Sequence, residues 1–292
     1  MTGKIIKGIA GFYYVYGEDH LIYECKAKGI FRNRSIKPAV GDNVEIAVLG
    51  TDPPEGNIEK ILPRKNTLVR PAAANVDQVL VVFALADPEP NLNLLDRFLV
   101  MVERLGIPAA VGFNKMDLSH ETVMDRYRQI YEPAGYPVLF FSACEDQGME
   151  AVRHFLTGKT TALAGPSGVG KSSLMNRILP DARMETGSIS EKIKRGRHTT
   201  RHSELFCTEP GTYLMDTPGF SSVFVDGMEE QELKDCFPEF HPFESECRFP
   251  GCVHIGERIC GVKAAVEEGK ISNSRYGNYQ LFYQELKNRR RY

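Results

Sequence analysis

The stretch GPSGVGKS at residues 165–172 could hold the phosphates of a nucleotide. It follows an apolar run and precedes a segment of helical periodicity, which is the context that a phosphate-binding loop requires. Its glycines would let backbone N–H groups wrap phosphate oxygens at the N-terminus of a helix, and Lys171 would reach the β- and γ-phosphates. The Ser172 hydroxyl would bind Mg²⁺. The residues expected around the phosphates are Gly165, Pro166, Ser167, Gly168, Val169, Gly170, Lys171, Ser172 and Ser173.

A second motif, NKMD at residues 114–117, could read the base of that nucleotide. The carboxylate of Asp117 could accept hydrogen bonds from the ring N–H and the exocyclic amine of guanine, and adenine offers no such pair. The turn SAC at residues 142–144 ends the next apolar run and could support the base through a backbone N–H. The nucleotide is therefore expected to be GTP or GDP. The residues expected beside the base are Asn114, Lys115, Asp117, Ser142, Ala143 and Cys144.

The sequence DTPG at residues 216–219 could complete the site at the phosphate end. Asp216 ends an apolar run, so a strand would deliver its carboxylate to the Mg²⁺, and Gly219 would offer its backbone N–H to the γ-phosphate. A basic segment containing GRHTT lies between the phosphate loop and this motif. Thr199 or Thr200 in that segment could give Mg²⁺ a second hydroxyl, and we favour Thr200.

The attacking water needs a group to orient it, and the residue after the DTPG glycine cannot serve. Many GTPases carry a glutamine at that position, whereas this chain has Phe220, whose ring cannot hold a water. The nearest candidate is His198 in GRHTT, because an imidazole can hold an attacking water by hydrogen bonding. Alternatively, His198 is a polar residue of a solvated loop or contacts an RNA phosphate. We expect His198 to be catalytic.

The order of these motifs is a rotation of the usual one. GTPases ordinarily place the phosphate loop first and the base-reading motif late, whereas here residues 114–117 precede residues 165–172. A chain cut after DTPG and rejoined elsewhere would keep every contact. Circular permutation of this kind is tolerated because the hydrogen bonds of a sheet do not depend on where the termini lie.

Alternating apolar runs and amphipathic segments over residues 71–222 predict an α/β core with a mostly parallel sheet. Residues 1–70 instead carry short β-prone runs separated by turn residues, which predict a small oligonucleotide-binding (OB-fold) β-barrel. Residues 223–292 are expected to form an α-helical zinc-binding region. Aromatic side chains of the barrel could stack on RNA bases or could fill its core. They are Tyr13, Tyr14, Tyr16, Tyr23 and Phe31.

Three cysteines and a histidine lie within fourteen residues of the C-terminal part, in the pattern Cys247-x4-Cys252-x-His254-x5-Cys260. Three thiolates and an imidazole suit tetrahedral zinc, and a segment with no core of its own needs such a cross-link. The alternative is a set of scattered buried cysteines with a surface histidine. Because all four positions are filled by the protein, the zinc is expected to be structural.

Composition places the chain among ordinary globular proteins. The formal net charge is −2, the hydrophobic share is 42%, and the apolar runs are too short to span a bilayer. The first residues lack the uninterrupted apolar stretch of a secretory signal. We expect a cytoplasmic monomer that does not bind membranes. The basic clusters near residues 183–202 and 271–292 are either solvated faces or RNA contacts.

Together, NKMD, GPSGVGKS, GRHTT, DTPGF and CRFPGCVHIGERIC resemble a known family, the circularly permuted ribosome small subunit-dependent GTPase A family. The resemblance covers nearly the whole chain. It implies slow GTP hydrolysis that the small ribosomal subunit and its rRNA stimulate during late maturation, and a catalytic histidine in GRHTT. Some GTPases without the glutamine bind potassium through an asparagine in the phosphate loop. Gly168 occupies that position, so potassium stimulation by that route is not expected.

Two other functions fit some of the same residues. An RNA-binding protein could hold GTP or GDP merely as a structural ligand, and it would then not turn over GTP faster beside small subunits. An ATP-dependent enzyme could use the phosphate loop, but the carboxylate of Asp117 disfavours adenine.

Overall fold

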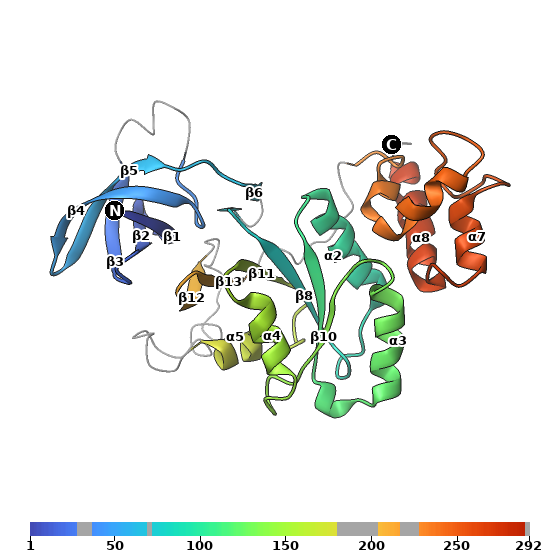
Figure 1. Cartoon of the computed structure of the whole chain (residues 1–292), viewed down its shortest axis with the longest axis horizontal. Coiled ribbons are helices and arrows are strands. Elements are labelled where there is room, and N and C mark those ends of the chain that lie inside the picture. Colours follow the sequence, from blue (N-terminus) through green and yellow to red (C-terminus); the bar gives the residue numbers. More distant parts are fainter. Residues whose placement is uncertain (28–36, 69–71, 180–203, 217–227, 290–292) are drawn as a thin grey trace. The chain divides into compact units, whose positions relative to one another are not determined.

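The computed structural model describes residues 1–27, 37–68, 72–179, 204–216 and 228–289. Its first five strands form a closed barrel in the order β1-β2-β3-β5-β4 (Figure 1). The strands are β1 (Thr2–Ile9), β2 (Phe12–Gly17), β3 (Ile22–Ala27), β4 (Asn43–Thr51) and β5 (Pro54–Ile61). Alternate residues of each strand point inward, so side chains such as Ile5, Val15 and Ile58 form the barrel core.

The barrel core also contains Tyr23, which is 1% exposed and whose hydroxyl bonds to Asp19. Of the two possibilities left open for Tyr23, stacking on a base or filling the core, the structure supports the second. Phe12, Tyr14 and Tyr16 alternate with buried Val15 along β2 and are partly exposed, so they share the outer face. Phe31 lies outside the described residues.

A second, open sheet has six strands in the order β10-β9-β8-β11-β13-β12. The pairs β10–β9 and β11–β13 are parallel, and β12–β13 is an antiparallel hairpin. Every residue of β8 is buried, as expected of a strand covered on both faces of a parallel sheet. The strands are β8 (Gln78–Ala84), β9 (Ala109–Asn114), β10 (Val138–Phe140), β11 (Thr160–Ala164), β12 (Leu205–Glu209) and β13 (Thr212–Asp216).

Helices alternate with these strands, which confirms the predicted α/β core. They are α2 (Leu92–Arg104), α3 (Glu121–Tyr131), α4 (Met149–Leu156) and α5 (Lys171–Ile178). The start of α2 follows directly from the sequence, because the Asn91 side chain accepts a hydrogen bond from the N–H of Leu94 and so caps the first turn. A short two-stranded sheet, β6 (Thr67–Leu68) with β7 (Ala73–Ala74), lies between the barrel and the core in the sequence.

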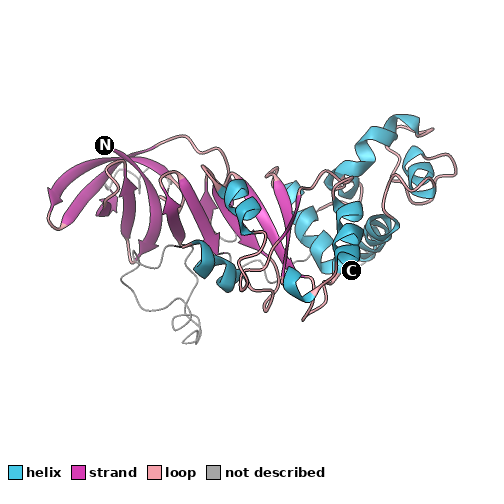
Figure 2. Ribbon diagram, turned by 60° about the horizontal axis from the view of Figure 1, so that its bottom comes forward, coloured by secondary structure: helices cyan, strands magenta, loops and turns pink. Residues whose placement is uncertain are grey.

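The described part of the C-terminal region is helical (Figure 2). Its core is rich in aromatic rings, and Phe237, Phe240 and Tyr279 pack within 5.3 Å between centroids. Its elements are η2 (Leu233–Cys236), η3 (Pro238–Glu246), α7 (Gly261–Glu267) and α8 (Asn273–Arg289).

A fully buried arginine ties this region to α2. Arg275 of α8 bonds to Asp96 of α2 at 2.8 Å and to both carboxylate oxygens of Glu239 at 2.8 and 3.1 Å. All three side chains are at most 4% exposed. Removing Arg275 would leave two buried carboxylates without a cation, and breaking a buried ion pair in this way costs about 3–5 kcal/mol. The cluster therefore fixes which face of α8 meets α2.

Contacts between Cα atoms divide the chain into two compact units. The first contains Met1–Val79, Glu150–Ala164 and Lys171–Ser221, and the second contains Leu80–Met149, Gly165–Gly170 and Ser222–Tyr292.

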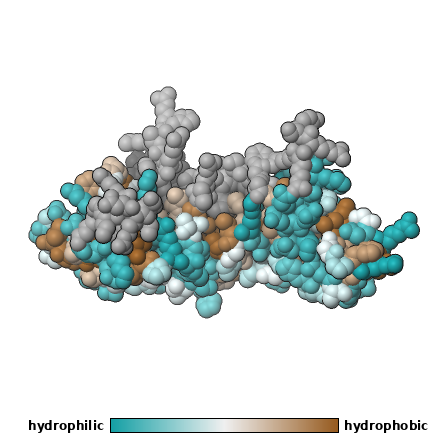
Figure 3. Space-filling model, turned by 90° about the horizontal axis from the view of Figure 1, so that it is seen from above, coloured by the Kyte–Doolittle hydropathy of each residue, from teal (hydrophilic) through white to brown (hydrophobic). Residues whose placement is uncertain are grey.

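No helix among the described residues is long and apolar enough to cross a membrane. In the space-filling view, hydrophobic residues are interspersed among hydrophilic ones on the visible face (Figure 3).

Candidate nucleotide and metal sites

The phosphate loop connects the end of β11 to the start of α5, as the sequence predicts. Close approach of neighbouring groups to its backbone requires glycine at two positions. Gly165 has φ +133°, and a Cβ there would lie 2.1 Å from the carbonyl oxygen of Val82. Gly170 has φ +91°, and a Cβ there would lie 2.2 Å from the Asn114 amide nitrogen. The glycines therefore allow close backbone approach, which a loop that wraps phosphates needs.

The side chain of Asn114 joins three of the predicted loops. Its Nδ2 donates to the carbonyl oxygen of Val169 at 2.9 Å, and its Oδ1 accepts from the N–H of Ala143 at 3.1 Å. Asn114 is 3% exposed, so both hydrogen bonds are buried. One amide thus connects the base-reading motif, the phosphate loop and the SAC turn. The sequence predicted Asn114 as a base contact and missed this bridging role.

The rest of the base-reading motif follows the end of β9. Lys115 adopts a left-handed conformation with φ +62°, and its Nζ donates to the carbonyl oxygen of Asp87. Asp117 lies in the short helix η1 (Met116–Leu118) and is exposed, as a carboxylate that receives a ligand must be. Ser142 is buried and its Oγ accepts from the N–H of Glu145 at 3.1 Å, while Cys144 is exposed.

Two of the predicted magnesium residues, Asp216 and Ser172, lie at the end of β13 and at the start of α5. The backbone of Asp216 pairs in register with Leu163 of β11, two residues before the loop begins. Ser172 is the second residue of α5. The end of β13 that carries Asp216 therefore lies beside the end of β11, from which the phosphate loop continues. The predictions for His198, Thr199, Thr200, Gly219 and Phe220 fall outside the described residues.

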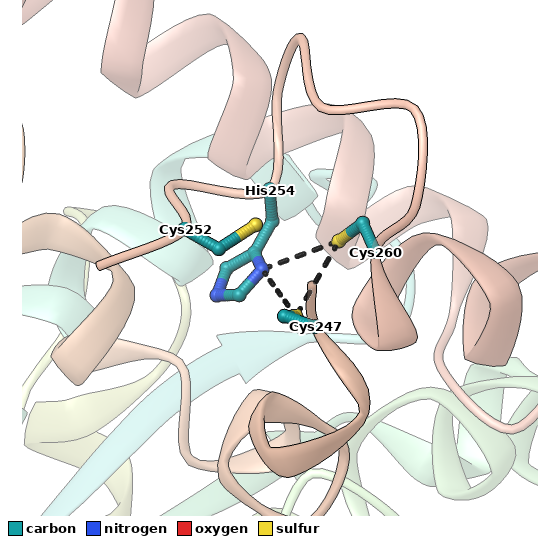
Figure 4. Close-up of side chains that lie close together, drawn as sticks. All are labelled: Cys247, Cys252, His254 and Cys260. Atoms are coloured by element: carbon teal, nitrogen blue, oxygen red, sulfur yellow. Dashed lines mark hydrogen bonds between the residues drawn. The ribbon is translucent and has the colours of Figure 1, made fainter. Parts of the chain in front are cut away.

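The three cysteines and the histidine converge, as Figure 4 shows. Their ligand atoms all lie within 4.8 Å of one another. His254 Nδ1 is 3.3 Å from Cys260 Sγ and 3.7 Å from Cys247 Sγ, and those two sulfurs are 3.9 Å apart. Four ligands around one tetrahedral zinc would be roughly 3.4–3.8 Å apart. The four side chains therefore could hold one zinc ion.

Surrounding groups favour metal binding by these residues. His254 Nε2 lies 3.3 Å from a carboxylate oxygen of Glu244, and donation to Glu244 leaves Nδ1 free to bind a metal. Burial lowers the pKa of His254, which favours the neutral imidazole that binds metals, although Glu244 opposes the shift. Burial also raises the pKa of the Cys252 thiol to about 12. A divalent cation supplies the positive charge that would deprotonate such thiols.

Two further carboxylates support this cluster and were not predicted. Glu244 also pairs with Lys234 at 2.6 Å, and Glu257 accepts from the backbone N–H groups of Val253 and Ile255. In the sequence, Glu244 lies three residues before Cys247, and Glu257 lies between His254 and Cys260. These positions alone are a weak signal of a supporting role, because acidic residues are common in any sequence.

A permuted order of strands, a glycine-dependent phosphate loop and a base-reading motif joined to it by Asn114 define a circularly permuted GTPase. The sequence model of the RsgA GTPase matches residues 61–226, and that of the RsgA N-terminal domain matches residues 2–56. The chain belongs to the RsgA GTPase family and is a GTP hydrolase.

Proteins of known name or structure are similar to this chain over its whole length. "Small ribosomal subunit biogenesis GTPase RsgA" of Agathobacter rectalis is 57% identical and that of Alkaliphilus metalliredigens is 50% identical, with at least 99% of both chains covered in each case. A crystal structure of YloQ, described as a circularly permuted GTPase, is 37% identical with a TM-score of 0.82, covering 99% of this chain and 95% of that one. YjeQ from Thermotoga maritima is 36% identical with the same TM-score, covering 98% of each chain.

Replacing Asp117 with asparagine should change the preferred base. The amide would lose the acceptor pair for guanine, and loss of two charge-assisted hydrogen bonds should weaken GTP binding about 100-fold or more. Xanthine, which carries a carbonyl where guanine carries its amine, should then be preferred. Competition between labelled GTP and XTP would measure this. Asp125→Asn, an exposed carboxylate of α3, is the matched control. Full GTP preference in Asp117→Asn would show that the motif does not read the base.

Purified protein should contain one zinc per chain, and Cys260→Ala should lose it. Because the ligands fix the chain around the cluster, metal loss should unfold the C-terminal region before the GTPase core. Glu244→Gln should weaken zinc binding about 10- to 100-fold through the histidine. Metal analysis and thermal melts would test this, with Cys207→Ser, a cysteine outside the cluster, as control. A metal-free parent that melts in one cooperative step would count against the site.

Proposed function

We propose that this protein hydrolyses GTP as a late maturation factor of the small ribosomal subunit, and that binding to the subunit's rRNA stimulates hydrolysis. The single observation that supports the nucleotide half is the buried Asn114 amide, which joins the predicted base and phosphate loops. The ribosomal half is supported by full-length relatives whose names contain small ribosomal subunit biogenesis. Such work would place the protein in the cytoplasm, and we propose that it acts as a monomer.

In the proposed site, Asp117 reads guanine and the SAC turn supports the ring. Lys171 and the loop N–H groups hold the phosphates, with Gly219 at the γ-phosphate. Ser172, Thr200 and Asp216 are the proposed magnesium ligands. Magnesium bound with GTP would neutralise charge on the β- and γ-phosphates. His198 would hold the attacking water by hydrogen bonding.

We propose three functional parts, residues 1–70, 71–222 and 223–292. The outer face of β2 suits single-stranded RNA, because Phe12, Tyr14 and Tyr16 form a row of rings on which bases could stack. Lys26 pairs with Phe12 across β2 and β3, and its Nζ lies 5.2 Å from that ring. The zinc in the third part would be structural, because the four protein ligands fill a tetrahedral shell.

GTP turnover with and without purified small subunits tests this function, with large subunits as the matched control. We expect small subunits alone to accelerate hydrolysis. His198→Ala should keep GTP and subunit binding but lose about 100-fold or more of the stimulated rate, because it removes the water-orienting group. His202→Ala, in the same basic segment, should retain stimulation.

Two outcomes would contradict the proposal. Equal turnover with small subunits, with large subunits and without either would favour a passive nucleotide-binding module. A His198→Ala variant that binds normally and is stimulated as strongly as the parent would exclude His198 from the mechanism.

A further inference from the structure

The barrel contacts the hairpin that carries Asp216, and the contact begins with a β-bridge. Lys7 of β1 and Glu204, the residue before β12, form an isolated antiparallel bridge. Their side chains form an ion pair at 2.8 Å and are 29% and 36% exposed. The register of β1 against β2 shifts between Ile5 and Lys7. A bulge of this kind re-aims a side chain, and here the residue that follows it meets the hairpin.

A second contact holds the other strand of the hairpin. Tyr213 of β13 is 7% exposed and contacts two barrel residues. The Tyr16 ring meets it edge-on, with centroids 6.3 Å apart and planes at 81°. The Lys4 ammonium lies 5.3 Å from the centre of the Tyr213 ring. Both contacts are of attractive types, an aromatic edge-to-face pair and a cation over a ring face.

These contacts bear on the predicted magnesium carboxylate through the register of β13. Tyr213 and Asp216 belong to the same five-residue strand, and Asp216 pairs with Leu163 beside the phosphate loop. The hydrogen bonds of β13 fix its register, so the strand cannot slide along its neighbours by a fraction of a residue. The position of Asp216 therefore depends on the contacts that hold the rest of the strand. The barrel contacts this hairpin just before β12, at Glu204, and near the start of β13, at Tyr213.

At the barrel end, the contact starts from the face proposed to bind RNA. Tyr16 is the last member of the row Phe12, Tyr14 and Tyr16 on β2. A base stacked on this row would therefore change the surroundings of a ring that also touches Tyr213. Half-exposed ion pairs contribute little to the free energy of folding. The Lys7–Glu204 pair therefore matters here because it marks where the barrel meets the hairpin, and not because it is strong.

We propose that Lys4, Lys7 and Tyr16 are positioning residues that couple RNA bound on the barrel to the placement of Asp216, through Glu204 and Tyr213 on the β12–β13 hairpin. This inference rests on the proposed function, because it specifies how subunit binding would reach the nucleotide site. Coupling is reciprocal, so the nucleotide should also alter the barrel.

Charge reversal in the full-length protein tests the link. Lys7→Glu and Glu204→Lys should each lower subunit-stimulated kcat about fivefold or more, which is the low end of ordinary coupling between sites. The double variant Lys7→Glu/Glu204→Lys should recover most of the stimulation, because the pair is restored in reverse. The two single variants change the charge of the protein in opposite directions. If both single variants lose stimulated kcat, the loss therefore cannot come from weaker electrostatic attraction between the protein and RNA.

The matched control is the Lys60–Glu45 ion pair, which joins β4 and β5 within the barrel at 3.1 Å. Its reversals, Lys60→Glu and Glu45→Lys, should keep the parent's stimulation. Single Lys7 and Glu204 reversals that are stimulated like the parent, or a double variant that remains as impaired as the singles, would overturn the proposal.

Hydrogen exchange supplies a readout that needs no ribosome. Exchange of the β1 amides should differ between protein loaded with GDP and protein loaded with a non-hydrolysable GTP analogue. The difference should disappear in each single reversal and return in the double variant. A parent whose β1 amides exchange identically with both nucleotides would overturn the coupling. If subunits fail to stimulate even the parent, the proposed function is wrong, and the exchange measurement still decides whether the barrel and the nucleotide are coupled.

Discussion

The nucleotide site depends on one buried amide. Asn114 donates to the phosphate loop and accepts from the SAC turn, so three loops that are distant in sequence are held in one arrangement. Buried polar groups must be paired, and here each partner is the backbone of a different loop. These two hydrogen bonds depend on the sheet that aligns the loops and not on the order of the loops along the chain. Circular permutation is therefore compatible with them.

The two flanking parts contact different parts of the GTPase core. Among the described residues, the barrel meets the β12–β13 hairpin, which leads to Asp216. The C-terminal region instead meets α2 through the buried Arg275 cluster and a second ion pair, Arg97 with Glu285. The members of the Arg275 cluster are at most 4% exposed, whereas Glu285 of the second pair is 43% exposed. The cluster is therefore expected to be the rigid part of that contact. The barrel contact uses partly exposed pairs and is better suited to change.

Local patterns in the sequence predicted the elements and the convergence of three cysteines and a histidine, but they did not predict long-range pairings. The glycines of the phosphate loop, the apolar run of β8 and the cysteine spacing each carry their own physical reason. The alternation of Tyr23 and Cys25 with Glu24 and Lys26 is a local signal that the Tyr23 ring faces the barrel interior. By contrast, nothing near Lys7 or Arg275 identifies Glu204 or Asp96 as the partner, because those pairings arise only when distant elements fold together.

GDP affinity of Asn114→Ala is the most direct test of the central claim. The variant would leave a buried carbonyl and a buried N–H unpaired, at about 1–3 kcal/mol each, so GDP and GTP affinity should fall about tenfold or more. The matched control is Asn66→Ala, because the Asn66 amide also makes two hydrogen bonds to backbone groups, both of them on Val76, which belongs to none of these loops. The control should lose stability and keep its nucleotide affinity. Unchanged GDP affinity in a folded Asn114→Ala variant would contradict the account.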